Sequence, residues 1–242
     1  MRLSSAVVTI AIIGGTGDEG FGLALRLAVG GEEVIIGSRS EERGREAADR
    51  AREILELGAG AGTRGEISGA ANDDAAAACD VVFVTVPYAG QAEIYRSITP
   101  ALRANALVCD TTTPLATAVG RPAWQVVRPW EGSAAEQAKA VLPKTVQLVA
   151  GFHTVAAEPL QALEHPVEGD VLLCGADREA KARIGGLIEK IPNLRWVDAG
   201  VLSMARVIEP LTALLVSVNR NYKLKKTGIR LVGRDVWGSP PA

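Results

Sequence analysis

The chain has 242 residues, of which 48% are hydrophobic and 22% are charged, and its formal net charge is −2. This length suits one α/β domain with an addition, or two small domains. The small net charge implies no general attraction to nucleic acid or to an anionic membrane. Cys79, Cys109 and Cys174 lie outside any metal-ligand spacing, so we expect buried thiols of a cytoplasmic protein. No stretch is expected to span a bilayer.

The first forty residues combine a strand, a glycine-rich turn and a helix. Ala6–Ile13 is apolar and rich in β-branched residues, and Phe21–Val29 has the apolar spacing of a helix. Between them, Gly15, Gly17 and Gly20 form the pattern Gly-x-Gly-x-x-Gly. In this setting the first glycine permits a tight turn, the second lets a pyrophosphate approach the backbone, and the third lets helix and strand pack closely. The sequence therefore predicts dinucleotide binding at the positive end of the helix.

The second predicted strand, Glu33–Ile36, is followed by the residues that choose between NAD and NADP. In an NAD site an acidic residue usually holds the ribose hydroxyls here, and none is present. Ser38, Arg39 and, one helical turn further on, Arg43 stand where a 2′-phosphate would lie, and a planar guanidinium suits a phosphate. We therefore expect NADP(H). The alternative interpretation is that both arginines belong to a solvated helix face.

Four weaker signals follow up to residue 78. Glu41–Leu57 has the spacing of an amphipathic helix, and Gly58–Gly62 is interpreted as a flexible connector. Glu66–Ser68 favours a short third strand. Asn72 is expected to cap an alanine-rich helix, because its side chain can accept a hydrogen bond from a first-turn amide.

Two apolar runs, Val81–Val86 and Leu107–Asp110, are typical of strands buried on both faces of a parallel sheet. In open α/β sheets, ligands bind at the loops that follow the carboxyl ends of the strands. One such loop is Thr111–Leu115, and another begins at Pro87-Tyr88. Tyr88 is therefore a candidate neighbour of the nicotinamide or the adenosine, although an ordinary capping aromatic explains it equally well.

The second half of the chain continues the alternation of strands and helices. We expect a surface excursion at 120–131, a helix at Ser133–Leu142, strands at Thr145–Ala150, Val171–Cys174 and Leu194–Val197, and a long helix at Ser203–Tyr222 that Pro210 interrupts. The predicted fold class is α/β, a Rossmann-type doubly wound, mainly parallel sheet with a C-terminal helical addition. We divide the chain into an NADP-binding domain, residues 1–200, and a C-terminal helix and tail, residues 201–242.

The sequence offers no clear acid–base pair. Tyr222 and Lys226 form Tyr-x-x-x-Lys, the proton-donor pair of short-chain dehydrogenases, but they lie past the sheet near the end of the chain. His153 and His165 are too isolated for a metal site, although His153 follows a strand and is a candidate ligand contact. An NADP site without such a pair suggests hydride transfer to an acceptor that needs little proton chemistry.

Further motifs follow the glycine turn in order. They are Gly22–Ala28, Gly37–Arg39, Cys79-Asp80, Val86-Pro87, Phe152–Thr154, Cys174-Gly175, Asp198–Gly200, Leu202-Ser203, Arg206, Glu209 and Leu211-Thr212. Together with Gly14–Gly20 they resemble the NADPH-dependent coenzyme F420 reductases (F420:NADP oxidoreductases), over residues 6–232. The resemblance implies reversible hydride transfer between NADP(H) and the deazaflavin coenzyme F420, small-molecule cosubstrates and a homodimer.

The resemblance also implies roles for single residues. Thr16, Gly17, Asp18 and Glu19 would line the pyrophosphate, beside the turn at Gly15. The 2′-phosphate would be bound by Ser38, Arg39 and Arg43. The nicotinamide half would be bordered by Tyr88, Ala92, Leu115 and Ala157, and the deazaflavin by Thr227. Residues 201–242 would close the deazaflavin site. No catalytic side chain and no metal site is implied.

Three positions depart from the family pattern. Asp18-Glu19 places two carboxylates in a turn meant for an anion, and Arg43 stands where a lysine is familiar. Lys223–Lys226 replaces a more neutral stretch. The placement of the hydride acceptor is therefore the least constrained part of the prediction.

Two other functions stay open at this point. An NADPH-dependent reductase of imines or 3-hydroxyacids is one, but hydroxyacid dehydrogenases usually carry a catalytic lysine in the long helix after the sheet, and Ser203–Tyr222 contains none. A non-catalytic NADP-sensing protein is the other, and it leaves the motifs from His153 onward without an explanation.

Overall fold

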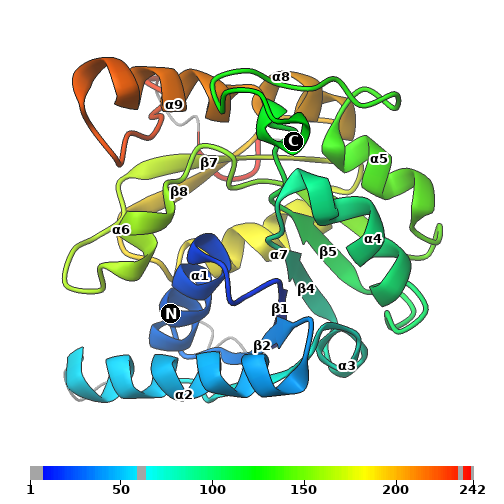
Figure 1. The fold of residues 1–242 in the computed structure, drawn as a ribbon, viewed down its shortest axis with the longest axis vertical. Helices are drawn as coiled ribbons and strands as arrows, with labels where there is room; N and C mark the ends of the chain where they lie inside the picture. The colour runs from blue at the N-terminus through cyan, green and yellow to red at the C-terminus, as the bar shows by residue number, and fades with distance from the viewer. Residues whose placement is uncertain (1–7, 59–63, 234–236, 241–242) are drawn as a thin grey trace.

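The structure is a computed structural model, which describes residues 8–58, 64–233 and 237–240. Its strands form one sheet in the order β3-β2-β1-β4-β5-β6-β7-β8 (Figure 1). Neighbouring strands are parallel, except that β6 and β7 are antiparallel. The strands are β1 (Thr9–Ile13), β2 (Glu33–Ser38), β3 (Ile67–Ala71), β4 (Val81–Val84), β5 (Leu107–Asp110), β6 (Gln147–Ala150), β7 (Gly169–Gly175) and β8 (Leu194–Asp198). The predicted fold class is confirmed.

Helices pack on both faces of this sheet (Figure 1). The α-helices are α1 (Asp18–Val29), α2 (Glu41–Gly58), α3 (Asn72–Ala78), α4 (Tyr88–Ile98), α5 (Ala134–Val141), α6 (Ala157–Gln161), α7 (Arg178–Ile188), α8 (Ala205–Ile208) and α9 (Leu211–Tyr222). Two 3-10 helices are η1 (Ala116–Val119) and η2 (Leu202–Met204). Strand order reverses between β1 and β4, which is the switch point at which such sheets bind ligands.

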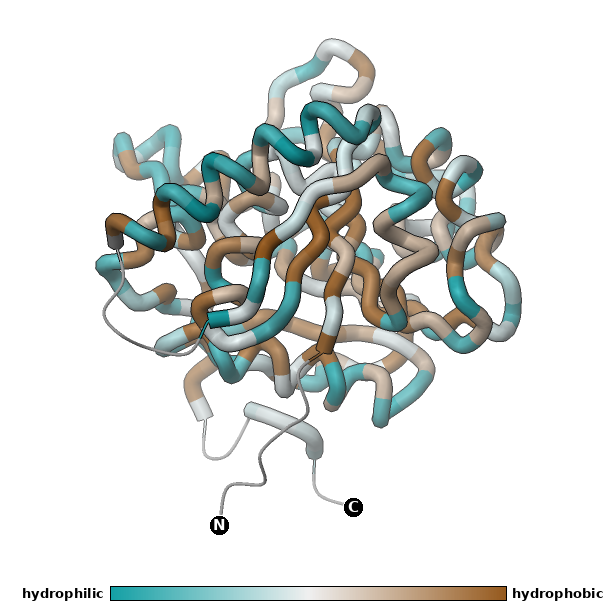
Figure 2. The backbone as a smooth tube through the Cα atoms, turned by 90° about the horizontal axis from the view of Figure 1, so that it is seen from below, coloured by the Kyte–Doolittle hydropathy of each residue, from teal (hydrophilic) through white to brown (hydrophobic). Residues whose placement is uncertain are grey.

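The side chains of β1 alternate between two hydrophobic cores. Ile10 and Ile12 pack with α1, α2 and α7 on one face, and Ala11 and Ile13 pack with α3, α4 and α5 on the other. All residues of β4 and β5 are buried, which explains why these strands have no polar alternation. Figure 2 shows the hydrophobic central strands enclosed by helices that carry hydrophilic residues.

The predicted role of Asn72 as an N-cap is wrong. Asn72 is the first residue of α3, and Ala71 occupies the capping position. The Asn72 side chain instead accepts a hydrogen bond from the backbone N–H of Gly14, with the two atoms 3.2 Å apart. Asn72 therefore bonds to the glycine turn instead of to a first-turn amide of its own helix.

Two other boundaries differ from the sequence expectation. α1 begins at Asp18 rather than at Phe21, because Gly17 adopts the extended conformation of an N-cap and acidic residues suit the first turn. α4 was not predicted, although it begins directly after the loop at Pro87. The expected connector at 58–62 lies outside the described residues from 59 onward.

Arg26 clamps α1 to the segment that contains α6. The side chain is 3% exposed, and its Nε donates to the carbonyl oxygen of Leu160 at 2.9 Å. Its Nη2 lies within hydrogen-bond distance of three further carbonyl oxygens, those of Pro159, Ala162 and His165. Burial lowers the pKa of Arg26. The carbonyl groups compensate for the water that this cation loses on burial.

The C-terminal addition packs against the carboxyl end of the sheet and then returns to β7. Pro210 separates α8 from α9, as predicted. The backbone N–H of Asp170 donates to the carbonyl of Ile229 at 2.8 Å, and the N–H of Leu231 donates to Oδ2 of Asp170 at 2.6 Å. The tail is thus anchored at the first residues of β7, while the division of domains at residue 200 stays a prediction.

The helical run Leu202–Tyr222 reaches the length and mean hydropathy, 1.2, of a membrane-spanning helix. On length and composition alone, the expectation that no stretch is apolar enough was wrong. Glu209 and Pro210 interrupt the run, and the Glu209 side chain is buried in protein contacts. Only 22% of the apolar window is fully buried, much of the rest is half-buried, and Val207 and Leu214 are exposed.

Candidate active site

The glycine turn holds the N-terminus of α1 close to the sheet. Gly14 has a φ of 72°, which favours glycine. A Cβ atom on Gly20 would lie 2.3 Å from Oγ1 of Thr85 and 2.8 Å from the Cα of Gly15, so only glycine permits this approach. The packing role that the sequence predicted for Gly20 is confirmed. The first-turn amides of α1, which have no partners within the helix, are available to an anion.

The two carboxyl groups of this turn have different surroundings. Asp18 is exposed. Oε2 of Glu19 accepts a hydrogen bond from Oγ1 of Thr111 at 3.2 Å, and the carboxyl lies deep although the residue as a whole is half-buried. Burial raises the pKa of Glu19 to about 8, against the opposing effect of the Thr111 hydrogen bond. A carboxyl that is neutral near pH 7 does not repel a phosphate, which reconciles Glu19 with an anion site.

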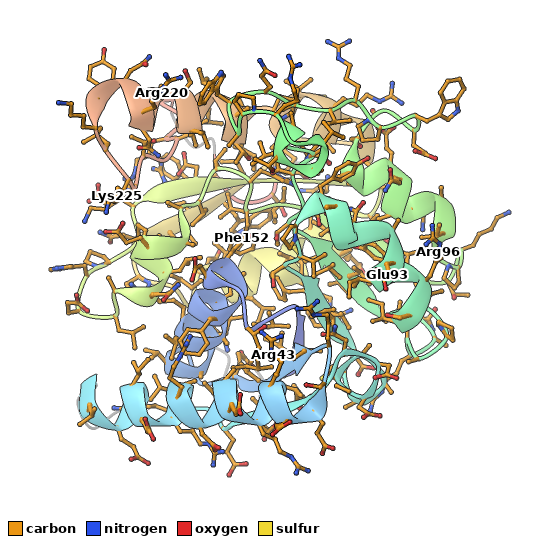
Figure 3. All side chains as sticks on the ribbon, in the orientation of Figure 1. Arg43, Glu93, Arg96, Phe152, Arg220 and Lys225 are labelled. Atoms are coloured by element: carbon orange, nitrogen blue, oxygen red, sulfur yellow. The ribbon has the colours of Figure 1, made fainter. Side chains whose placement is uncertain are left out.

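A cleft of about 480 Å³ lies beside the end of β2. Ser38 and Arg39 line it on the β2 side, where Ser38 is buried and Arg39 is exposed. Asp73 of α3 and Glu93 of α4 line it as well, which sequence reasoning missed. Arg43 does not line this cleft; it is exposed on α2 and appears above that helix in Figure 3. A hydroxyl and a guanidinium side by side fit a phosphate.

A second cleft, of about 290 Å³, opens at the carboxyl ends of β1, β4 and β5. The glycine turn forms one wall through Gly17, Asp18 and Glu19. The loops after β4 and β5 form the other, and Leu115 lies in the second of them. Thr212 of α9 completes the lining. The structure thus brings the predicted phosphate turn, Leu115 and the C-terminal helix to one place.

A buried carboxylate, Asp110, shapes the loop after β5. It accepts hydrogen bonds from the hydroxyl of Tyr95 at 2.6 Å, from Nε2 of Gln91 at 3.0 Å and from the backbone N–H of Thr112 at 2.8 Å. Burial raises the pKa of Asp110, and these hydrogen bonds oppose the rise. The loop at Thr111 and Thr112 is therefore held by a side chain that lies beneath it.

The loop after β6 meets α9 at the same cleft. Phe152 has a φ of 69°, which is strained for a non-glycine residue, and its ring packs edge-on against Phe83 with the centroids 5.9 Å apart (Figure 3). Oγ1 of Thr212 donates to the carbonyl of His153 at 2.7 Å and lies 2.9 Å from Oγ1 of Thr113. Thr212 therefore joins the loops after β5 and β6. The sequence singled out Thr212 only as part of a motif.

The imidazole of His153 is enclosed in this loop. The residue is 5% exposed, and within the described residues neither ring nitrogen makes a hydrogen bond of good geometry. Burial lowers the pKa of His153 to about 4, although the backbone of Thr112 is close enough to oppose this change. The ring is consequently neutral at pH 7.

Glu209 joins the C-terminal addition to the N-terminus of α5. Its Oε2 and Oε1 accept hydrogen bonds from the backbone N–H groups of Ala134 and Ala135, at 2.8 and 3.0 Å. Burial raises the pKa of Glu209 to about 8, although these two hydrogen bonds oppose the rise. This carboxyl occupies the N-terminus of α5, so it positions α5 against α8.

Seven predicted residues lie outside the lining of both clefts, and three of them are Gly15 and Thr16 of the glycine turn and Arg43 of α2. Tyr88 begins α4, and its hydroxyl donates to Oε1 of Gln137 at 2.9 Å. The others are Ala92 on α4, Ala157 at the start of α6, and Thr227 after α9. Their contacts with the cofactor or the acceptor stay predictions. Within the described residues, no group of three or more acidic, histidine or cysteine side chains is arranged to hold a metal.

Comparison with known proteins identifies the family. The family described as "NADP oxidoreductase coenzyme F420-dependent" matches residues 9–114. The F420-dependent NADP reductase of Methanocaldococcus jannaschii is 41% identical over 227 residues, which cover 94% of this chain and 99% of that protein. The chain belongs to the family of F420-dependent NADP reductases. The family member of Methanothermobacter thermautotrophicus is 42% identical over 228 residues, covering 93% and 95% of the two chains. The resemblance found in the sequence is confirmed.

Solved structures share the fold of this F420-dependent NADP reductase family member. An Arthrobacter sp. FB24 protein that is described as an F420-dependent NADP reductase superposes with a TM-score of 0.76 at 22% identity, covering 93% of this chain and all of that one. A 3-hydroxyisobutyrate dehydrogenase of Mycobacterium tuberculosis gives 0.57 at 15% identity, covering 90% and 62% of the two chains. At these identities both comparisons show the fold alone.

We predict that the parent loses folding stability as the pH rises above neutral, and that the variant Glu19→Gln loses less. Between the unfolded pKa of 4.5 and the folded value of about 8, the unfolded chain has released a proton that the folded chain keeps. The stabilising contribution is therefore complete below pH 4.5 and is lost as the pH rises through 8. The melting temperature of the variant relative to the parent should rise between about pH 5 and about pH 9. Glu42→Gln, at an exposed carboxyl of α2, is the control. An offset that is the same at both pH values contradicts the assignment.

We predict that Arg39→Ala weakens NADPH binding about tenfold or more and leaves NADH binding unchanged. A charge-assisted hydrogen bond to a phosphate contributes about 1.5–3 kcal/mol. NADH has no 2′-phosphate, so its binding does not include this hydrogen bond and should not change. Fluorescence titration with both cofactors measures the two dissociation constants. Arg45→Ala is the control, because Arg45 pairs with Glu41 on the exposed face of α2. Equal losses for both cofactors in Arg39→Ala would reject the 2′-phosphate assignment.

Proposed function

We propose that this chain transfers a hydride reversibly between NADP(H) and the deazaflavin coenzyme F420. The observation that carries the proposal is the position of α9, which closes the second cleft through Thr212, bonded to Thr113 and to the carbonyl of His153. The nicotinamide of a Rossmann-type sheet lies at the carboxyl ends of these strands. A planar acceptor ring enters between that ring and the C-terminal addition.

The reaction needs little from ionisable side chains. The hydride leaves nicotinamide C4 with its bonding electron pair and forms a bond with C5 of the deazaflavin, and a proton from water completes the reduced acceptor. The glycine turn holds the pyrophosphate, and the loop that begins at Thr111 forms a wall beside the reacting rings. Thr212 ties the loop after β6 to this wall. Orientation of two rings and exclusion of water are the contributions that the protein supplies.

The proposed contacts follow the cofactor along the site. Gly15, Thr16 and Gly17 with the first-turn residues Asp18 and Glu19 bind the pyrophosphate. Ser38, Arg39 and Arg43 bind the 2′-phosphate. Tyr88, Ala92, Leu115 and Ala157 border the nicotinamide half, and Thr227 borders the deazaflavin. Leu115 has the strongest support among the last group, because it lines the second cleft.

A reductase of imines or 3-hydroxyacids is the second candidate, and the positions of the lysines count against it. α9 carries no lysine. Lys181 of α7 is buried and bonded to Asp198 and to the carbonyl of Gly200 at the end of β8, so it is committed to a structural ion pair. An NADP sensor without turnover binds no second substrate, so it would leave the second cleft beside α9 without a function.

The direct test is transfer of label. The protein is incubated with NADPH that carries deuterium at C4 and with coenzyme F420, an imine or a 3-oxoacid in separate reactions. We expect deuterium at C5 of the reduced deazaflavin and no product from the other acceptors. Reduction of the imine or oxoacid alone would establish the second candidate, and tight NADPH binding without any product would establish the sensor.

We predict that His153→Ala and Tyr88→Phe keep measurable turnover with the deazaflavin. The imidazole is neutral and enclosed, and the Tyr88 hydroxyl is bonded to Gln137, so neither group is placed to transfer a proton. General acid–base catalysis contributes roughly 10²–10⁴-fold, and we expect losses below that range. Steady-state rates with coenzyme F420 and NADPH measure the effect. A loss near the top of the range in His153→Ala, with NADPH affinity intact, would reveal a proton-transfer step.

We further propose a cytoplasmic homodimer that pairs through α8, α9 and the neighbouring surface segment, residues 120–131. Val207, Leu214 and Trp124 are exposed on these elements, and the guanidinium of Arg220 lies 4.2 Å from the ring centre of Trp124. An apolar surface shared by neighbouring elements is typical of a protein–protein interface. The three cysteines are buried and unpaired, which suits a reducing compartment.

We predict that light scattering gives twice the chain mass for the parent and a lower mass for the double variant Val207→Glu/Leu214→Glu. Two buried charges without partners would strongly oppose association at that surface. Leu57→Glu is the control, because Leu57 is exposed on α2, at a distance in sequence and structure from α9. A parent at the mass of one chain would contradict the dimer, and an unchanged double variant would place the interface elsewhere.

A further inference from the structure

Three lysines at the C-terminal end of α9 have no side-chain partners among the residues that the structure describes. Lys223, Lys225 and Lys226 are exposed, and within the described residues none of their side chains makes a hydrogen bond or an ion pair. The stretch from Arg220 to Arg234 contains six cations and no acid, in a chain whose net charge is −2. Such a concentration of positive charge attracts an anionic ligand.

The backbone folds this segment into a defined shape. Lys223 ends α9 with a φ of 55°, which turns the chain back on the helix. The backbone N–H of Leu224 then donates to the carbonyl of Asn219 at 2.8 Å. The N–H and Oγ1 of Thr227 both donate to Oδ1 of Asn219, at 3.3 and 3.0 Å. The three lysines are therefore presented around one turn rather than along a free tail.

The same segment lies next to the loop that borders the hydride site. Asp170 anchors the following residues through Ile229 and Leu231, and its carboxylate is also held by both Nε and Nη2 of Arg195. The carbonyl of Asp170 accepts a hydrogen bond from Oγ1 of Thr154 at 2.9 Å. The anchored tail thus connects the lysine turn to the loop after β6. Figure 3 shows Lys225 and Arg220 on one side of the molecule, with Phe152 near its centre.

The two neighbouring arginines are engaged in other contacts. Arg220 lies over the ring of Trp124, and Nη2 of Arg230 is 3.4 Å from the carbonyl of Asn193. The lysines remain as flexible point charges, which suit a ligand that carries several anionic groups without a fixed geometry.

We propose that Lys223, Lys225 and Lys226 bind the anionic tail of the deazaflavin, which consists of a phosphodiester and glutamyl carboxylates. The proposal rests on the hydride transfer proposed above and assigns the part of the acceptor that does not react. The deazaflavin ring enters the second cleft, and its tail extends past Thr227 over the lysine turn. Exposed charges act over about 10 Å at 0.1 M salt, so they capture the acceptor without touching the reacting rings.

The test compares substrates with and without the tail. The triple variant Lys223→Gln/Lys225→Gln/Lys226→Gln is assayed with coenzyme F420 and with the deazaflavin that ends at its ribityl chain and has no phosphate. We expect the KM for coenzyme F420 to rise roughly five- to tenfold at low salt, with an unchanged kcat. The KM for the truncated deazaflavin and the Kd for NADPH should not change. Raising the salt concentration should remove the difference between variant and parent.

A variant with the same loss of charge is the control. Arg52→Gln/Lys144→Gln/Arg183→Gln removes three exposed cations from α2, the α5–β6 loop and α7, none of which lines the two clefts. This control should leave both KM values at those of the parent.

Three outcomes overturn the proposal. They are an unchanged KM for coenzyme F420 in the lysine variant at low and high salt, an equal rise for the tailed and the truncated acceptor, and an equal rise in the control variant. Failure of the proposed hydride transfer is a separate result, in which the parent reduces neither deazaflavin.

Discussion

The candidate site depends on the close approach of α1 to the carboxyl edge of the sheet. Gly20 has no room for a side chain against Thr85 and Gly15, and Oγ1 of Thr85 donates in turn to the carbonyl of Ile13 at 3.0 Å. β1, β4 and the first turn of α1 therefore meet at one point. Because this contact sets the direction of the helix, it places the helix amides at the switch point of the sheet. Both the anion site and one wall of the second cleft therefore depend on the close packing of Gly20 against the sheet.

Buried carboxylates hold segments that follow β5 by binding backbone amides. Asp110 holds the N–H of Thr112, and Glu209 holds the first amides of α5. Asp170 does the same for the tail at Leu231. Burial of a carboxyl is unfavourable unless hydrogen bonds satisfy it, and each of these groups receives at least two. Of the three, Asp110 acts directly on a loop that lines the second cleft. The reacting groups belong to the two cosubstrates.

The sequence predicted those parts of the site that depend on local pattern. The strands buried on both faces, the glycine turn and the loops after the strands follow from short-range composition and from the rule for open sheets. What was missed depends on partners far along the chain. Asn72 bonds to Gly14 rather than capping its own helix. Burial beneath distant segments raises the pKa of Glu19 to about 8, although the hydrogen bond from Thr111 opposes the rise. Asp73 reaches the cleft beside β2 for the same reason, since α3 packs there.

The clamp at Arg26 bears on how long the folded chain persists. Its bond to Leu160 joins residues 134 positions apart, and the bonds to the neighbouring carbonyls span similar separations. Contacts between residues so far apart in sequence form late in folding, because closing the long loop between them costs conformational entropy. Interactions that are absent from the folding transition state slow unfolding and leave the folding rate nearly unchanged. A contact that spans this much of the chain is therefore expected to slow unfolding more than it speeds folding.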